Sequence, residues 1–480
     1  MKRKFITNLI LLLFLNLLVK PFWIFGIDRT VQNVVGDENY GFYFALFNFS
    51  LILNILLDVG ITSFNNRNIA QHNFLLSKHF SYLVSLKLLL AIAYTIVSLL
   101  IASIIGYNKL QIQLLLFLIF NQFLASFILY LRSNISALHL FRTDSLISVL
   151  DRTLMIAICS FLLFNNFLRQ QFSIQWFVYA QTASYSITAL ITFFIVLRKS
   201  GRFRITIKPA FYLVFLRKSY PYAILILLMA LYNRIDSVML ERMLPGNRGQ
   251  EQAGIYAQAF RLMDAISMVG VLFAGLLLPI FAKMIKQNQS VVPMVKLSYT
   301  LIMIPAIFLA VTSIYYDEEI MSALYTTNTI YSSNLLGILM IGYTGIATTY
   351  IFGTLLTANG SLKYLNIMAF TGMIINVSLN IILIPRLEAY GSAYASMITQ
   401  LFTGGLQLIM ALYIFKFKLG FKYILQLLFF TVIVFALAHF TQSIEKWLIG
   451  YIISIAGSAV AAFLLRLISI KGMLNILMYK

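Results

Sequence analysis

The feature that most constrains this chain is a succession of long apolar runs, each about twenty residues, separated by short polar loops. A helical run of that length matches the hydrocarbon thickness of a bilayer. With 61% hydrophobic and 11% charged residues over 480 positions, the chain has too much apolar surface for a water-soluble fold. The runs lack period-two alternation, which indicates helices rather than a membrane β-barrel. We therefore predict an all-α polytopic membrane protein.

The apolar runs predict fourteen transmembrane helices, so both termini are expected on one side of the membrane. The first run follows a basic start and imitates a secretory signal, but it contains Asn16 and Lys20 and lacks a small-residue cleavage site. We expect it to be retained as the first helix. The predicted spans are residues 6–27, 40–63, 79–106, 114–139, 146–167, 174–197, 216–240, 253–280, 295–316, 331–357, 363–385, 391–415, 423–443 and 446–469.

Charge is sorted between alternate loops. With the N-terminus in the cytoplasm, most of the 36 basic residues fall in inner loops and tails, and most of the 15 acidic residues fall in outer loops. This is the pattern of the positive-inside rule, because basic residues near span ends resist translocation. The net charge of +21 is therefore interpreted as a topology signal and not as nucleic-acid binding. The densest basic run, residues 198–218, is expected to face anionic membrane lipids.

The chain contains an internal repeat of six predicted spans. An even number of spans gives both copies the same orientation, related by an axis along the membrane normal. We predict an N-terminal six-helix lobe at 1–210, a second at 211–420, and two additional transmembrane helices at 421–480. Transporters of this kind bind substrate between the lobes; a duplicated scaffold without transport is the alternative. An offset of 213 residues aligns Asp28 and Arg29 with Glu241 and Arg242, Glu38 with Glu251, and Gly41, Tyr43 and Phe47 with Gly254, Tyr256 and Phe260.

Charged residues inside the predicted spans are the candidate functional groups, because intramembrane charge is costly. Six basic residues against four acidic ones favour an anionic substrate. In the alternative interpretation the charges neutralise each other and fix helix packing. The acidic residues are candidates for charge pairing or for coupling to H⁺ or Na⁺, and the sequence does not choose between the ions. The basic residues are Lys20, Lys87, Arg132, Arg152, Arg234 and Arg261, and the acidic residues are Asp58, Asp151, Asp236 and Asp264.

Three local patterns refine this picture. The charges of spans 7 and 8, at residues 234–236 and 261–264, are predicted to reach similar depths and to form one cluster. Lys87 is expected to extend its ammonium to the inner membrane surface. Residues that bend helices or allow close packing lie within spans. They are Pro21, Pro305, Gly337, Gly342, Gly345, Gly404 and Gly405.

Several functions are disfavoured by missing motifs. There is no G-x-x-x-x-G-K-[ST] loop, so we expect no ATPase activity. Cys159 is the only cysteine and the four histidines lack metal-ligand spacing, so we expect no cofactor or metal. A membrane polymerase or glycosyltransferase would need a sizeable catalytic loop, and the predicted loops are short. We therefore expect the protein not to be an enzyme.

The sequence resembles a known family. The resemblance covers almost the full length and is to polysaccharide exporters, within the MOP superfamily that also contains multidrug (MATE) antiporters and lipid II flippases. The segments that carry it are residues 20–29 (KPFWIFGIDR), 36–43 (GDENYGFY), 57–60 (LDVG), 67–70 (RNIA), 234–240 (RIDSVML), 254–264 (GIYAQAFRLMD), 380–385 (NIILIP) and 390–395 (YGSAYA).

The resemblance implies a Wzx-type flippase of a bacterial inner membrane, with cytoplasmic termini. Such a protein moves a polyprenyl-pyrophosphate-linked oligosaccharide, an O-antigen or capsule repeat unit, to the periplasmic leaflet by alternating access. Its implied partners are this lipid-linked substrate, membrane lipids, and polysaccharide polymerase and chain-length machinery, with no nucleic acid. A MATE-type cation-coupled multidrug exporter is the alternative. The residues implied to hold the pyrophosphate are Lys20, Arg29, Arg132, Arg234 and Arg261.

Overall fold

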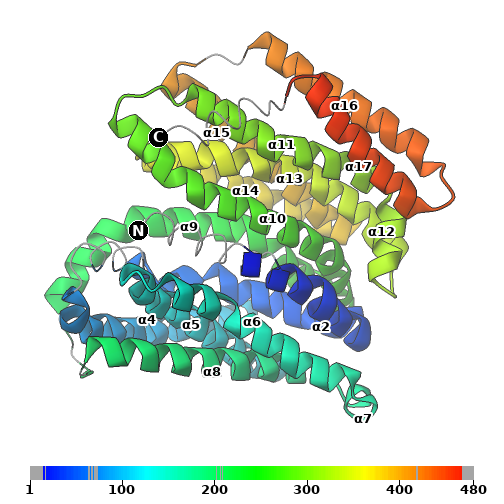
Figure 1. Cartoon of the computed structure of the whole chain (residues 1–480). Helices are drawn as coiled ribbons and strands as arrows, with labels where there is room; N and C mark the ends of the chain where they lie inside the picture. Colours follow the sequence, from blue (N-terminus) through cyan, green and yellow to red (C-terminus); the bar gives the residue numbers. More distant parts are fainter. Residues whose placement is uncertain are drawn as a thin grey trace. The chain divides into compact units, whose positions relative to one another are not determined.

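The computed structural model confirms the all-α class (Figure 1). It describes residues 14–16, 18–62, 65, 69, 74–201, 203–205, 207, 209–417 and 420–467, and no strand occurs among them. The chain divides into two compact units, residues 1–254 and 255–480. The predicted lobe boundary near residue 210 stays a prediction.

The first unit is a bundle in which long helices pack side by side. Helix α8 lies against α5 and α6, and α2 lies against α9 and α5. Lipid-facing side chains of α4 recur every fourth residue from Ile92 to Ile104, which is one face of a helix. The elements are η1 (Trp23–Asp28), α2 (Arg29–Ile52), η2 (Asn54–Leu57), α4 (Leu75–Ile105), α5 (Lys109–Ala137), α6 (Phe141–Phe164), α7 (Asn166–Gln170), α8 (Ile174–Ser200) and α9 (Pro209–Met243).

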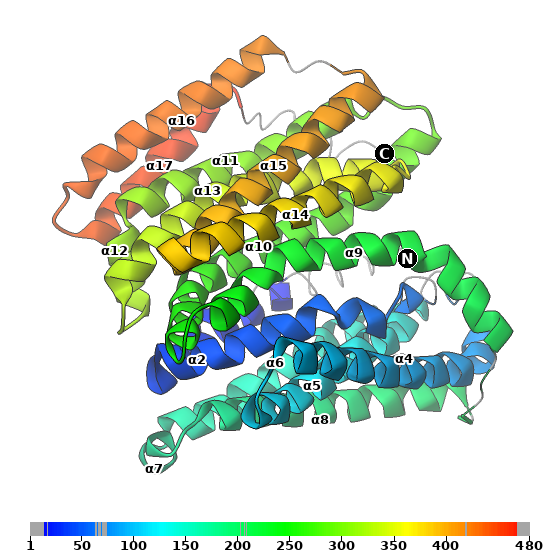
Figure 2. The same ribbon diagram turned by 180° about the vertical axis from the view of Figure 1, so that it is seen from behind.

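The second unit is a bundle built around α13. Helix α13 packs on α15 and α11, and α14 packs on α15, while α16 and α17 pack on each other and on α11 (Figure 2). Helix α10 begins in the first unit and continues into the second. The elements are α10 (Arg248–Lys286), α11 (Val292–Tyr315), α12 (Asp317–Leu324), α13 (Thr329–Ala358), α14 (Leu362–Leu387), α15 (Ala389–Phe415), α16 (Phe421–Gln442) and α17 (Trp447–Leu464).

Twelve helices within the described residues are long and apolar enough to cross a membrane, in approximate agreement with the fourteen predicted spans. The first predicted span, 6–27, lies partly outside the described residues. The second, 40–63, differs from its prediction: α2 starts at Arg29, bends at Gly36 (φ 79°, ψ 167°), ends at Ile52 and gives way to the short helix η2. Polar residues interrupt the apolar run here, so the chain does not form one straight span.

Repeat-equivalent residues meet where α2 crosses the first turns of α10. A Cβ on Gly41 would lie 1.8 Å from the carbonyl oxygen of Gln250, and a Cβ on Gly254 would lie 2.0 Å from that of Asp37. The offset that aligns Gly41 with Gly254 also aligns Asp37 with Gln250. A reciprocal contact of this kind is what a local two-fold relation produces. The glycines are required because the backbones touch.

Glycine also sets the spacing of α13 and α15. A Cβ on Gly404 would lie 2.5 Å from the carbonyl oxygen of Gly345, and a Cβ on Gly345 would lie 2.3 Å from that of Gln400. Small residues let membrane helices approach closely. These two glycines therefore serve packing, which is one of the two roles expected from the sequence.

We predict that Gly404→Ala destabilises the protein by about 1–3 kcal/mol, because its methyl group overlaps backbone that must move. The thermal unfolding midpoint of the purified protein in detergent measures the effect. Gly405→Ala is the matched control, since nothing lies within 4 Å of a Cβ at that position. Equal midpoints for the two variants would contradict the packing role.

Candidate functional site

Polar side chains of the first unit lie in the helical segment before η1, at residues 14–16 and 18–22. Asn16 is buried and donates a hydrogen bond from Nδ2 to Oγ of Ser148 in α6, at 2.9 Å. Half-buried Lys20 follows one turn later, directly before Pro21 and the π-helix η1. Segments of π-helix are rare and frequently mark functional sites. The local geometry therefore places Lys20 at an irregular turn beside α6.

Lys20 is grouped with other basic side chains. It lies between Asn16, which bonds Ser148 of α6, and Trp23, whose ring contacts Arg152 of α6, and it is within electrostatic range of Arg132 on α5 and of Asp151 and Arg152 on α6. Within the described part of the chain, Lys20 forms no ion pair. We call Lys20, Arg132 and Arg152, with the neighbouring Asp144 and Asp151, the basic cluster.

The two arginines of the cluster are neutralised to different extents. Arg132 Nε donates to Oδ1 of Asp144 at 2.8 Å, a direct charge-assisted hydrogen bond. Arg152 Nε lies 3.7 Å from Oδ2 of Asp151, which is too long for a hydrogen bond. The Arg152 side chain is 28% exposed. Arg152 therefore keeps more of its charge available than Arg132 does.

Aromatic rings hold Arg152 in place. Its guanidinium lies 5.5 Å from the ring centre of Trp23 in η1 and 5.7 Å from that of Tyr185 in α8. Trp23 stacks on Phe177, and Tyr43 contacts Phe177 edge-on at 5.3 Å. Cation–π contacts position a guanidinium without cancelling its charge. The carboxylate of Asp28 lies within electrostatic range of Arg152 and accepts a hydrogen bond from Tyr40 Oη at 2.9 Å.

The sequence predicts Arg152 as an intramembrane charge but does not place it among the residues expected to bind an anion. Arg152 is distinguished by its contacts with two aromatic rings, Trp23 of η1 and Tyr185 of α8. These elements are distant from α6 in sequence, so no local pattern identifies the contact. The adjacent acid, Asp151, was the only local signal.

The remaining predicted basic residues lie elsewhere. Arg29 opens α2, and its Nε is buried without a hydrogen-bond partner among the described residues. Arg234 of α9 donates from Nη1 to Oδ1 of Asn48, at the long distance of 3.5 Å. Arg261 is half-buried in the part of α10 that belongs to the second unit.

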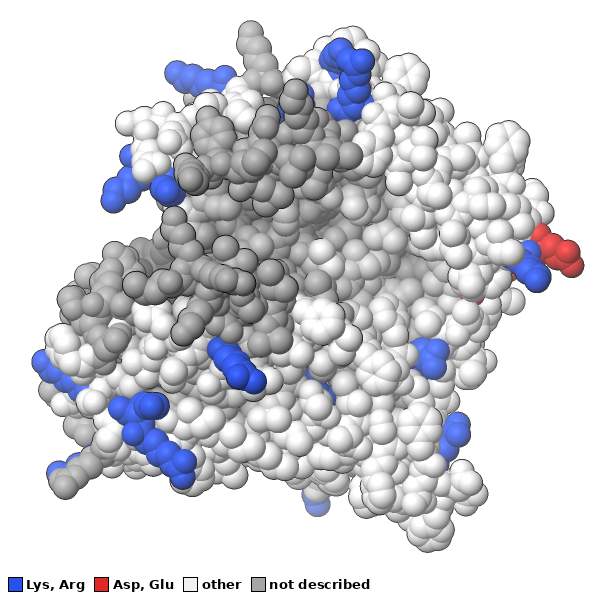
Figure 3. Space-filling view, viewed as in Figure 1, with Lys and Arg blue, Asp and Glu red and all other residues white. Residues whose placement is uncertain are grey.

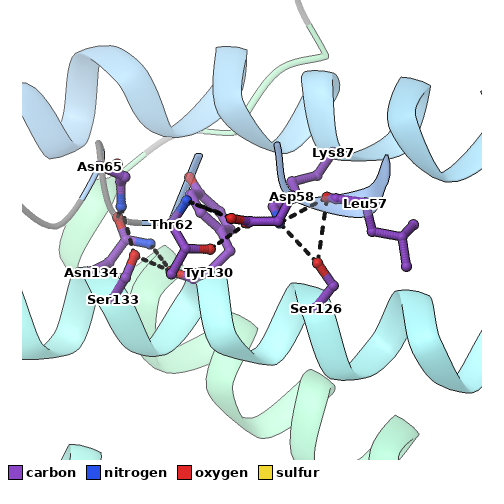
Figure 4. Close-up of polar contacts among 9 residues, drawn as sticks. All are labelled: Leu57, Asp58, Thr62, Asn65, Lys87, Ser126, Tyr130, Ser133 and Asn134. Atoms are coloured by element: carbon purple, nitrogen blue, oxygen red, sulfur yellow. Dashed lines mark hydrogen bonds and ion pairs between the residues drawn. The ribbon is translucent and has the colours of Figure 1, made fainter. Parts of the chain in front are cut away.

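The predicted acidic residues also lie in different parts of the structure. Asp236 of α9 is buried, and Asp264 of α10 is half-buried. They belong to different compact units, and the expectation of one shared cluster across spans 7 and 8 stays a prediction. Asp58 pairs with Lys87 of α4 (Figure 4). The expectation that Lys87 extends to the membrane surface is wrong, because its side chain is 1% exposed and turns toward Asp58.

Charged side chains are unevenly distributed on the one face that Figure 3 shows. On the face shown in Figure 3, Lys and Arg side chains are more frequent toward the left, and acidic side chains are visible only near the right-hand edge. Which side of the membrane these side chains face stays a prediction from the loop charges.

Known proteins share this sequence pattern and fold. The family model described as "Polysaccharide biosynthesis protein" matches residues 7–285. No curated protein sequence matches the chain significantly. The solved structure of the lipid II flippase MurJ in an inward closed conformation superposes with a TM-score of 0.71 at 16% identity, covering 95% of this chain and 99% of that one.

Multidrug transporters have the same fold. The inward-facing structure of a multidrug resistance MATE family transporter of the MOP superfamily gives a TM-score of 0.59 at 14% identity, covering 82% of this chain and 94% of that one. A MATE transporter from Vibrio cholerae gives 0.56 at 10% identity, covering 85% and 95%. At these identities the likeness concerns the fold alone.

We predict that Asp144→Asn lowers the stability of the first unit by about 1–3 kcal/mol, because it leaves the partly buried Arg132 without its charged acceptor. Thermal unfolding in detergent measures the loss, and Glu445→Gln, which neutralises an exposed acid between α16 and α17, is the control. In a double-mutant cycle with Arg132→Gln, the second substitution is expected to add little to the first. Fully additive losses would contradict a direct pair.

Proposed function

Since this chain belongs to the polysaccharide biosynthesis protein family, we propose that it flips a lipid-linked oligosaccharide across a bacterial inner membrane. The substrate is a polyprenyl-pyrophosphate-linked O-antigen or capsule repeat unit. It moves from the cytoplasmic to the periplasmic leaflet, with the sugars passing through the protein while the lipid tail stays in the bilayer. The fold is one shared by inward-facing and outward-facing transporters, which supports alternating access.

The observation that carries this proposal is that Lys20 lies beside Arg152 of α6, between the contact of Asn16 with Ser148 and that of Trp23 with Arg152, within electrostatic range of Arg132. A pyrophosphate that leaves water needs charge-assisted donors, and an arginine offers a planar fork that matches phosphate oxygens. Lys20 forms no ion pair within the described residues, and Arg152 is held by rings and not by a close carboxylate. Cationic groups kept in this state inside a membrane protein are costly unless a ligand uses them.

The competing function is export of cationic drugs coupled to H⁺ or Na⁺. A cation-binding site requires available carboxylates, and three acidic side chains of the first unit already lie beside basic ones. Asp144 bonds Arg132, Asp151 adjoins Arg152, and Asp58 bonds Lys87. Asp236 and Asp264 stay as candidates for ion coupling. The balance of available charge favours the anionic substrate.

We predict that Lys20→Ala and Arg152→Gln each reduce glycan export about tenfold or more, because each removes a charge-assisted contact worth about 1.5–3 kcal/mol. The assay is complementation of a deletion strain, with surface glycan and the leaflet location of lipid-linked oligosaccharide as readouts. Cytoplasmic-leaflet accumulation is expected in both variants. Arg169→Gln, an exposed substitution in α7, is the control at matched expression.

Charge reversal separates the two functions. Under our proposal, Lys20→Glu and Arg152→Glu abolish glycan export, because they place a carboxylate against the pyrophosphate. For a drug exporter the same changes would preserve or improve efflux of organic cations. Normal surface glycan in the deletion strain, together with lost drug resistance, would contradict the proposal.

A further inference from the structure

The second transmembrane segment breaks inside the first unit, next to buried charge. Helix α2 ends at Ile52, η2 covers Asn54–Leu57, and Val59 and Gly60 follow with φ of 41° and 83°. A positive φ is strained for a β-branched residue such as valine. Non-helical backbone at membrane depth is tolerated only where protein or a water-filled cavity satisfies its polar groups. The question is what satisfies this break.

The ammonium of Lys87 fills the break (Figure 4). Its Nζ donates to the Leu57 carbonyl at 3.0 Å, to Oδ1 of Asp58 at 2.5 Å and to Oγ of Ser126 on α5 at 3.0 Å. An ammonium has three donors, so all three are used. The three acceptors are a backbone carbonyl, a carboxylate and a hydroxyl, drawn from two separate elements.

A surrounding layer fixes these oxygens. Thr62 donates from Oγ1 to Asp58 Oδ1 at 2.5 Å, and its backbone N–H donates to the same carboxylate. Tyr130 of α5 presents its ring centre 6.0 Å from the ammonium. Beyond it, Asn65 bonds Ser133 and Asn134, which joins the far side of the break to α5. The oxygens are thus held by the fold and not by Lys87 alone.

Such a set of oxygens is the kind that binds a free cation. Secondary transporters coordinate Na⁺ with the unwound carbonyls and half-helix ends of broken spans. Hard cations select carboxylate, carbonyl and hydroxyl oxygens. The ammonium of Lys87 occupies the position that such an ion would take, and it reaches there from α4 on a fully buried stem.

We propose that the break at residues 57–62 is an alkali-cation site whose occupant is the tethered ammonium of Lys87. The covalent cation completes the broken span, so Asp58 needs no dissolved Na⁺ or K⁺ in the native protein. Removing only the ammonium exposes the site to a free alkali cation. This inference does not depend on the lipid-linked substrate, and its test measures ion binding and not export.

The test uses the full-length protein in lipid nanodiscs and the variant Lys87→Met, which keeps the apolar stem and deletes the charge. Thermal unfolding is measured in NaCl, KCl and choline chloride at equal ionic strength. We expect the variant to unfold several degrees below the native protein in choline chloride and to regain most of that loss in NaCl or KCl, saturably. The native protein is expected to show no difference between the salts.

Two further variants identify the ligands. In Lys87→Met/Asp58→Asn the recovery by alkali cation is expected to disappear, because the carboxylate is gone. Lys78→Met removes an exposed lysine of the same helix and should behave as the native protein in every salt. Ammonium chloride, as a small untethered ammonium, is expected to stabilise Lys87→Met in the same way as the alkali cations.

Two results would overturn the inference. One is a Lys87→Met protein whose stability is identical in sodium, potassium and choline salts, which is the behaviour of a pair with a packing role only. The other is a native protein stabilised by Na⁺ or K⁺ in a manner that Asp58→Asn removes. If Lys87→Met does not fold, the native protein and Asp58→Asn still decide this second point.

Discussion

The structure depends on one constraint: inside a bilayer, each polar group must find its partner within the protein. Helix α8 shows the simplest solution, where Ser184 and Thr188 donate to the backbone carbonyls four residues earlier, at 2.8 Å each. Charges need stronger arrangements. The Asp58–Lys87 and Arg132–Asp144 pairs join consecutive or neighbouring spans, because an ionised group left alone in this medium is costly.

The departures from that constraint are informative. Lys20 and Arg152 have cationic groups that no carboxylate holds closely among the described residues. The ammonium of Lys87 differs from these groups, because all three of its N–H donors form hydrogen bonds. The rings of Trp23, in the π-helix η1, and of Tyr185 orient Arg152, whose side chain is 28% exposed. The first unit thus contains one cationic group whose donors are all used, at Lys87, and two that no close carboxylate neutralises among the described residues, at Lys20 and Arg152.

Close backbone packing forms a second layer of organisation. Gly41 and Gly254 meet at the reciprocal crossing of α2 and α10, and Gly345 and Gly404 meet between α13 and α15. In water, apolar area would dominate such contacts, but lipid tails are as apolar as the side chains. Association therefore relies on close fit, which only glycine allows at these separations.

Sequence alone determined the class, the approximate spans and the residues that carry intramembrane charge, because bilayer thickness and the cost of charge act on local composition. It also identified the repeat that places Gly41 opposite Gly254. Only the tertiary structure decided which charges pair. Lys87 was expected at the membrane surface but fills the break beside Asp58, and Arg152 gains its ring contacts from η1 and α8. Pairing depends on distances between helices far apart in the chain, and no local pattern specifies them.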